Sequence, residues 1–173
     1  MNNEILFLRH GKAANPVGVA DIDRPLKPRG IRQACRIGAW LKDNEALPDV
    51  VLSSTAKRAH DTARHALVQA GLDPAAIRLD KRLYFDTDAH LTAAVAACDG
   101  AGKRLLVVGH NPWMEEWVLN LADTPPSHPG GNWYMKTGAL MRFAVPDFSD
   151  GLKPGQGRLL DHVLPRHLED DDL

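Results

Sequence analysis

Short apolar runs alternate along the chain with segments of helical periodicity. Residues 5–8 and 105–108 are continuously apolar, which is typical of strands that are buried on both faces of a parallel sheet. Residues 28–43 instead place apolar side chains three and four positions apart, as in an amphipathic helix. This alternation of strand and helix patterns predicts an α/β fold with a mostly parallel central sheet.

The same reasoning assigns the remaining elements. Strands are expected at residues 4–8, 49–53, 77–80, 104–109, 139–145 and 158–164, the last two as an edge hairpin. Helices are expected at 28–43, from residue 54 to about 69, and at 88–98, the second one with Ser54 and Thr55 as capping residues. A fourth helix is expected to begin with Asn111 as its N-cap and Pro112 in its first turn. The inward face of the first helix is predicted to carry Ile31, Ala34, Cys35, Gly38 and Leu41.

Composition narrows the class of protein. The chain has 173 residues, 44% of them hydrophobic, so residues 1–168 are expected to form one domain and the acidic residues 169–173 a frayed tail. A net charge of -1 argues against a nucleic-acid surface. No apolar run is long enough for a membrane span or a signal-peptide core, so the protein is expected in the cytoplasm. Cys35 and Cys98 lack CxxC spacing and are expected as reduced core residues.

Polar side chains follow three of the predicted strands. Arg9 and His10 end the first strand, Arg58 lies in the first helical turn after the second, and His110 follows the strand at 104–109. Parallel strands joined by helices present their C-terminal ends on one side, so these four side chains are expected to converge. Taken alone, Arg9 and His10 are equally well explained as polar residues that close a strand.

Two arginines and two histidines suit phosphate chemistry. Guanidinium groups bind phosphoryl oxygens through paired N–H donors and remain charged at any relevant pH. A neutral imidazole can attack phosphorus, and a second imidazole, if protonated, can donate to the phosphoryl oxygens. The N-terminus of the helix near Asn111 adds positive potential. This scheme requires no metal and no cofactor.

Several segments resemble those of a known family. The chain is similar to members of the histidine phosphatase superfamily, and within it to the short SixA-like phosphohistidine phosphatases. The resemblance rests on Leu8–Gly11, Arg24–Leu26 with Arg29–Gly30, Ser53–Ala59 with Thr62–Ala63, Val108–Pro112 and Thr137–Ala139, which occur in family order. It implies a three-layer α/β/α sandwich of the phosphoglycerate mutase-like type.

The resemblance also implies roles for individual residues. His10 would be the nucleophile, Arg9 and Arg58 would hold the phosphate, and His110 would be the second phosphate-binding histidine. Arg24, in the family's Arg-Pro-Leu segment, would border the phosphate pocket.

The sequence leaves open which residue, if any, donates a proton to the leaving group. Mutase-like members carry a glutamate on a longer insertion that this chain lacks, and an asparagine where this chain has Pro16. Asp86 or Asp88 could supply the proton, although both are also explained as turn and helix N-cap residues. A strong acid is dispensable when the leaving group is a protonated phosphoimidazole, but not when it is an alkoxide.

The leading hypothesis is a metal-independent phosphatase that acts on phosphohistidine in a protein partner, such as a signalling phosphotransfer domain, through a phospho-His10 intermediate. Two alternatives remain: a small-molecule phosphomonoesterase of the same superfamily, and a non-catalytic phosphohistidine-binding module. No nucleic acid and no membrane is expected as a partner. Trp133 and Tyr134, in a glycine-rich loop, are expected to line a binding surface, whereas Trp113 and Trp117 are expected in the core.

Overall fold

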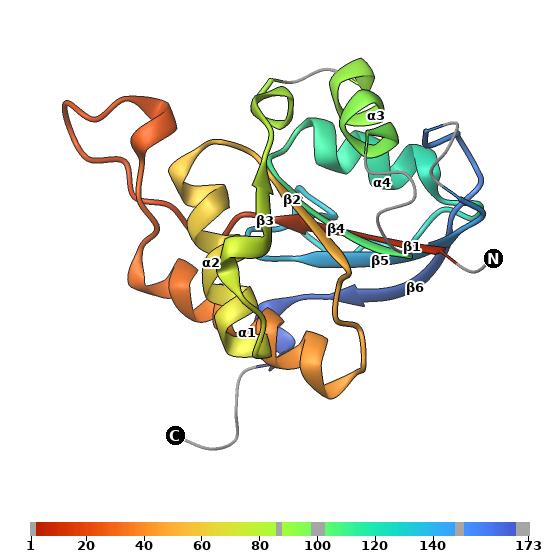
Figure 1. The fold of residues 1–173 in the computed structure, drawn as a ribbon, viewed down its shortest axis with the longest axis horizontal. Coiled ribbons are helices and arrows are strands. Elements are labelled where there is room, and N and C mark those ends of the chain that lie inside the picture. Colours follow the sequence, from red (N-terminus) through yellow and green to blue (C-terminus); the bar gives the residue numbers. More distant parts are fainter. Residues whose placement is uncertain (1–2, 86–87, 98–102, 148–150, 169–173) are drawn as a thin grey trace.

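The computed structural model describes residues 3–85, 88–97, 103–147 and 151–168. Its centre is a six-stranded sheet in the order β3-β2-β4-β1-β5-β6 (Figure 1). The strands are β1 (Asn3–Arg9), β2 (Val50–Ser53), β3 (Ile77–Leu79), β4 (Arg104–Gly109), β5 (Leu140–Val145) and β6 (Arg158–Val163). The first four strands are parallel, and β5 and β6 add an antiparallel edge. The predicted mostly parallel sheet and its edge hairpin are confirmed.

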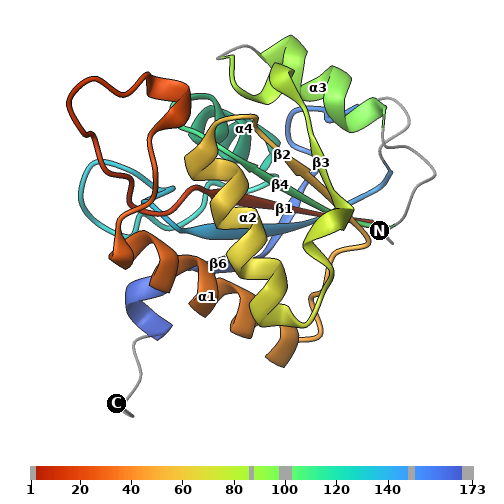
Figure 2. The ribbon, with the colours of Figure 1, turned by 60° about the vertical axis from the view of Figure 1, so that its left-hand side comes forward.

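Helices cover both faces of this sheet. Helices α1 (Pro28–Asp43) and α2 (Lys57–Ala70) lie on one face, and α3 (Asp88–Ala96) and α4 (Trp113–Leu121) lie on the other (Figures 1 and 2). The described part of the chain also has short 3-10 helices: η1 (Asp21–Asp23), η2 (Pro74–Ala76) and η3 (Lys81–Leu83) between these elements, and η4 (Pro165–Leu168) after β6. The expected three-layer α/β/α sandwich is therefore confirmed.

The central strand β1 divides the core into two halves. Ile5 and Phe7 belong to the cluster under α3 and α4, whereas Leu6 and Leu8 belong to the cluster under α1 and α2. All four side chains are fully buried, because successive residues of a strand point to opposite faces and both faces are covered. Burial on both faces of the sheet therefore explains why residues 5–8 are all apolar.

The register of the central strands positions their C-terminal ends. Arg9 of β1 pairs with Gly109 of β4, so His10 and His110 each follow a paired position directly. The backbone N–H of His10 also donates to the Gly109 carbonyl at 3.0 Å. The two histidines therefore leave adjacent strands side by side.

The packing of α1 differs from the prediction in its first turn. Ile31 is 36% exposed, while Ile37 is fully buried. The helix starts with Gly30 against the backbone of Lys12, where a Cβ atom would clash, so backbone contact rather than a large side chain seats this end of the helix. Cys35 is a free and only partly buried cysteine, and Cys98 lies outside the described residues.

Two predicted helix caps were wrong. Pro112, not Asn111, is the N-cap of α4. Asn111 Oδ1, the atom that would accept from the helix, has no hydrogen-bond partner among the described residues, while the amide nitrogen donates to the Met135 carbonyl at 2.9 Å. Ala56 is the N-cap of α2, although Ser54 Oγ still accepts from the Ala56 N–H at 3.2 Å. None of the described helices has the length and apolar character needed to cross a membrane. The acidic tail, 169–173, lies outside the described residues.

Candidate active site

His10 and His110 lie together at the C-terminal end of the parallel strands. Their ring centroids are 5.2 Å apart, and the ring planes are inclined by 55°. Arg58 and His110 line the same pocket of about 310 Å³. Arg9 and Arg58 are close enough to lower the pKa of both imidazoles, after the larger effect of burial. The predicted convergence of these four side chains is confirmed.

The orientation of His10 leaves one ring nitrogen free to react. Its Nδ1 lies 2.8 Å from the carbonyl oxygen of Gly11. A carbonyl oxygen can only accept, so Nδ1 carries the proton and Nε2 carries the lone pair. Burial, followed by the charges of Arg58, Arg9 and Arg24, lowers the pKa of His10 to about 4. At neutral pH His10 is therefore an uncharged imidazole suited to nucleophilic attack.

His110 is held by a serine. A 2.7 Å hydrogen bond joins His110 Nε2 to Ser54 Oγ, whereas the buried Nδ1 has no hydrogen-bond partner among the described residues. A buried polar atom of this kind suits a ligand. Burial first, then the charges of neighbouring groups, lowers the pKa of His110 to about 3, so the ring is uncharged at neutral pH, and an anion beside it would favour its protonation.

Arg9 is fixed from the side of β5. Its Nη1 donates to the Met135 carbonyl at 2.9 Å, and its Nε is buried with no partner among the described residues. Burial lowers the pKa of Arg9, while the nearby charge of Glu115 opposes that shift. Glu115 accepts from the Met135 N–H at 2.9 Å, so it also holds the segment on which Arg9 rests.

The Arg9 guanidinium also lies over the Trp133 ring, 5.9 Å from its centroid. This distance permits a cation–π contact. Trp133 is 42% exposed, in agreement with its predicted place on a binding surface. Trp113 and Trp117 are buried, as predicted.

Arg58 is held by Asp21, which the sequence reasoning missed. Arg58 Nη1 donates to the Asp21 carbonyl oxygen at 2.7 Å, and Nη2 donates to the Asp21 carboxylate at 3.1 Å. Tyr84 donates its hydroxyl to the same carboxylate at 2.7 Å. The Tyr84 hydrogen bond, with those from Arg24 and Arg58, lowers the pKa of Asp21 to about 2. Asp21 is thus an anion at neutral pH that holds Arg58 and Arg24 in place, and not a proton donor.

Arg24 lies in the loop between β1 and α1, next to Asp21. Its Nε donates to the Ala14 carbonyl at 3.0 Å, and its Nη1 donates to Asp21 at 3.2 Å. Its charge contributes to the lowered pKa of His10. Both hydrogen bonds hold the loop between β1 and α1, so the geometry gives Arg24 a role in shaping the pocket.

Thr62 links the nucleophile loop to α2. Its Oγ1 accepts from the Gly11 N–H at 2.9 Å and donates to the Arg58 carbonyl at 2.7 Å. Gly11 also packs against the backbone of Gly30, where a Cβ atom would clash. The position of Thr62, four residues after Arg58 in the recognised segment, was the available sequence signal.

The suggested proton donors cannot be placed. Asp86 lies outside the described residues, and Asp88 is the first residue of α3, with a side chain that is not described. Their neighbour Phe85 lines the catalytic pocket together with Asp21, Tyr84 and Asn111, so this segment starts at the rim of the site.

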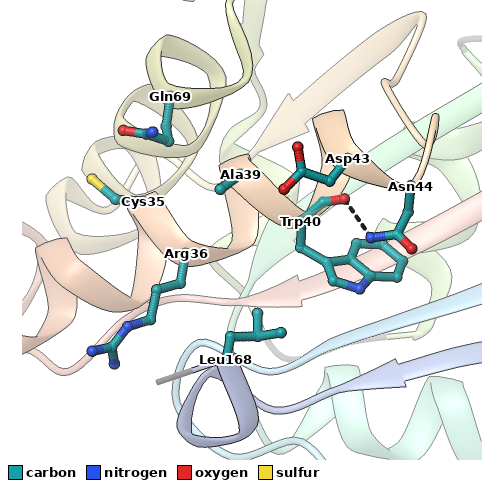
Figure 3. Close-up of a pocket in the computed structure, with 8 residues that line it drawn as sticks. All are labelled: Cys35, Arg36, Ala39, Trp40, Asp43, Asn44, Gln69 and Leu168. Atoms are coloured by element: carbon teal, nitrogen blue, oxygen red, sulfur yellow. Dashed lines mark hydrogen bonds between the residues drawn. The ribbon is translucent and has the colours of Figure 1, made fainter. Parts of the chain in front are cut away.

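A larger cavity of about 350 Å³ lies elsewhere, between α1, α2 and η4 (Figure 3). It contains none of the four converging residues, and its walls include Cys35, Trp40 and Leu168. Size alone therefore does not identify the reactive site. Within the described parts of the chain, no group of three or more His, Cys, Asp or Glu side chains could hold a metal ion.

Comparisons with known proteins agree with this geometry. Residues 5–84 match the family model of the histidine phosphatase superfamily (branch 1). An uncharacterized protein of Mycobacterium tuberculosis is 42% identical over 115 residues, which cover 66% of this chain and 70% of that protein. A 2,3-bisphosphoglycerate-dependent phosphoglycerate mutase of Arthrobacter sp. is 33% identical over 129 residues, but this match covers only 49% of the mutase.

Solved structures extend the similarity to nearly the whole chain. The protein histidine phosphatase SixA, in complex with tungstate, superimposes with a TM-score of 0.75 at 25% identity, covering 96% of this chain and 99% of that one. A SixA structure from Agrobacterium tumefaciens gives a TM-score of 0.74 at 27% identity, with 95% and 100% of the two chains covered.

Proposed function

Because this chain belongs to the histidine phosphatase superfamily, we propose that it hydrolyses phosphohistidine on a protein partner through a phospho-His10 intermediate. The family relationship makes the chain a phosphatase. What we propose beyond this is the protein substrate, the covalent intermediate and the roles of the individual residues. The observation that carries the proposal is the fixed tautomer of His10, whose Nδ1 donates to Gly11 and whose ring stands 5.2 Å from that of His110.

In the first step, His10 Nε2 forms a bond to phosphorus while the bond from phosphorus to the substrate imidazole breaks. The leaving imidazole takes the electron pair of that bond and, if its other nitrogen was already protonated, departs as a neutral ring. His10 keeps its Nδ1 proton against the Gly11 carbonyl throughout, so no proton has to leave the nucleophile.

The surrounding cations stabilise the transferring phosphoryl group. Arg58 is 7% exposed, and Arg9 is partly buried, so their charges act in a region of reduced solvent screening. His110, with Nδ1 unpaired, supplies a further donor once the phosphoryl charge raises its pKa.

In the second step, water attacks the phosphorus of phospho-His10. The His10–phosphorus bond breaks, neutral His10 is regenerated, and the protons of water pass to phosphate and solvent. The net reaction is hydrolysis of the phosphoryl group, with no electron transfer.

Exposed apolar side chains around the pocket favour a protein substrate. Phe85 is 54% exposed at the pocket wall, Trp133 is 42% exposed over Arg9, and Ile22 is 37% exposed next to Asp21. Exposed aromatic and aliphatic groups around one site are typical of protein-binding surfaces. A phosphohistidine side chain presented on a folded partner could reach the pocket while its surroundings contact this rim.

A small phosphoester is the second candidate substrate. The similarity to a phosphoglycerate mutase and the pocket volume of about 310 Å³ are both compatible with a small metabolite. The non-catalytic alternative is disfavoured, because a binding module would not need a nucleophile with a fixed tautomer.

Phosphate release from a phosphohistidine-containing protein, compared with release from a small alkyl phosphate, tests the proposal. We expect kcat/KM to be at least about a hundredfold higher for the phosphohistidine protein, because its leaving group needs no strong acid. Equal or faster hydrolysis of the alkyl phosphate would instead support the small-molecule phosphomonoesterase.

A further inference from the structure

A second basic pocket lies beside the catalytic site. It has a volume of about 270 Å³ and is lined by Arg29, Gln33, Lys136, Thr137, Leu164, Pro165 and Arg166. Three of these residues are cationic and none is acidic. We propose that this pocket is an anion-binding subsite that receives carboxylate side chains of the phosphohistidine protein, an inference that rests on the proposed function.

Two of the three cations of this pocket, Arg29 and Lys136, are available to a ligand in the described part of the chain. Within the described residues, neither Arg29 nor Lys136 forms an ion pair with an acidic side chain, and Arg29 is exposed. The chain as a whole has a net charge of -1. Two cations in one pocket, Arg29 and Lys136, without an acidic partner among the described residues are therefore a specific feature of this surface.

Backbone features position these side chains. Arg166 Nη2 donates to the Pro129 carbonyl at 3.2 Å, which ties its guanidinium to the glycine-rich loop. The Lys136 ammonium lies beside Gly131, where a Cβ atom would be 3.0 Å from Nζ. Gly131 has a φ of +82°, so a larger residue there would both strain the backbone and crowd the ammonium group.

Gly138 lies between the backbone of His10 and the basic pocket. Its N–H donates to the His10 carbonyl at 3.0 Å, and a Cβ atom at Gly138 would lie 2.9 Å from Gln33 and 3.0 Å from Pro165, both of which line the basic pocket. Gln33 also accepts from the Lys12 N–H at 2.9 Å. Gly138 and Gln33 thus link the basic pocket to the chain at His10 and Lys12.

The two pockets also face the same end of the sheet. Lys136 and Thr137 precede β5, which runs antiparallel to β1, and Pro165 and Arg166 follow β6. The start of α1 and the η4 turn lie together at this end (Figure 2). A partner that places phosphohistidine at His10 can therefore place neighbouring groups in the basic pocket.

Carboxylates are the expected ligands of this pocket. Arginine pairs with carboxylates through two parallel N–H donors, and lysine adds a point charge. Exposed ion pairs are individually weak, so the subsite is expected to select among phosphohistidine proteins and not to create the affinity alone.

Two phosphohistidine peptides that differ only in their neighbouring residues test this subsite. One carries glutamates around the phosphohistidine and the other carries glutamines. In the Arg29→Gln/Lys136→Gln double variant we expect KM for the acidic peptide to rise about three- to tenfold with kcat unchanged, as for the loss of two partly exposed charge pairs. KM for the glutamine peptide and for phosphoramidate should remain unchanged.

Lys42→Gln is the matched control, because Lys42 is an exposed cation in the last turn of α1, remote from the pocket. It should change neither KM. The measure is the KM for the glutamate peptide divided by the KM for the glutamine peptide. The subsite is disproved if the double variant leaves this ratio unaltered, or if Lys42→Gln alters it equally.

A binding measurement separates failure of the subsite from failure of the proposed function. If the wild-type protein hydrolyses neither peptide, the proposed function is wrong, and the subsite is then judged by calorimetric titration with the unphosphorylated acidic peptide. Binding that is weakened by the double variant but retained in His10→Ala supports the subsite. Binding that is absent, or insensitive to the double variant, overturns it.

Discussion

Asp21 holds Arg58 through two different atoms, its backbone carbonyl oxygen at 2.7 Å and its carboxylate at 3.1 Å. The two residues are far apart in the sequence, and the contact brings the loop between β1 and α1 over the start of α2. Because the carboxylate also accepts from Tyr84 and Arg24, it organises one side of the phosphate pocket.

Asp21→Asn should lower kcat/KM for a phosphohistidine substrate about three- to tenfold. The backbone contact to Arg58 remains, so the loss should be smaller than the loss of about a hundredfold or more expected for Arg58→Ala. Tyr84→Phe, which removes one hydrogen bond from the same carboxylate, should have a smaller effect. A loss in Asp21→Asn as large as in Arg58→Ala would contradict a positioning role and give Asp21 a direct part in the chemistry.

His110→Ala should reduce kcat by about a hundredfold or more, because a donor to the transition state is lost. Ser54→Ala removes the 2.7 Å hydrogen bond to His110 Nε2 but leaves the ring in place, so we expect a smaller reduction of about tenfold. Steady-state kinetics on both variants provides the check. If Ser54→Ala has no effect, the hydrogen bond from Ser54 does not help to position His110.

The activity should be insensitive to pH from neutrality down to about pH 5. Burial and neighbouring arginines lower the pKa of His10 to about 4, and only its neutral form can attack phosphorus. As the pH falls through about 4, protonation of His10 should therefore reduce kcat/KM, by about tenfold per pH unit at the limit. A profile measured with a substrate that is stable in acid checks this, and a decline centred near pH 6.5, the ordinary pKa of histidine, would contradict the buried environment of His10.

The leaving group of the substrate should determine whether the enzyme needs a general acid to protonate it. Phosphoramidates should exceed alkyl phosphates in kcat/KM by a wide margin, and Asp86→Asn and Asp88→Asn should change phosphoramidate turnover less than about twofold. Rapid alkyl phosphate hydrolysis that collapses in either variant would identify a dedicated acid and favour a metabolite as the substrate.

The sequence predicted the strands that end just before His10 and His110. Four consecutive apolar residues before His10 are explained by burial on both faces of the sheet, and the parallel βα pattern places strand ends together. The pairing of Arg9 with Gly109 is a matter of strand order, which periodicity does not reveal. The convergence of the two histidines could be expected, but their neighbouring strands could not be derived from the pattern alone.

The residues that support the site could not be predicted in the same way. Asp21 lies in a segment without periodicity, and its contact with Arg58 depends on the path of the loop through space. Ser54 was predicted as a capping residue because serine commonly precedes a helix. In the structure its Oγ accepts from the Ala56 N–H, although Ala56 is the N-cap, and the same oxygen is also bonded to His110. A local pattern shows only the first of these two roles.

The central claim is the phospho-His10 intermediate, and rapid-quench trapping with a phosphohistidine substrate labelled on phosphorus tests it most directly. During turnover, wild-type protein should carry label that is stable in alkali, lost in acid and located by mass spectrometry on His10. His10→Ala should carry no label and should lose activity by about a thousandfold or more while remaining folded. Unlabelled wild-type protein at full turnover, with His10→Ala still active, would contradict the mechanism.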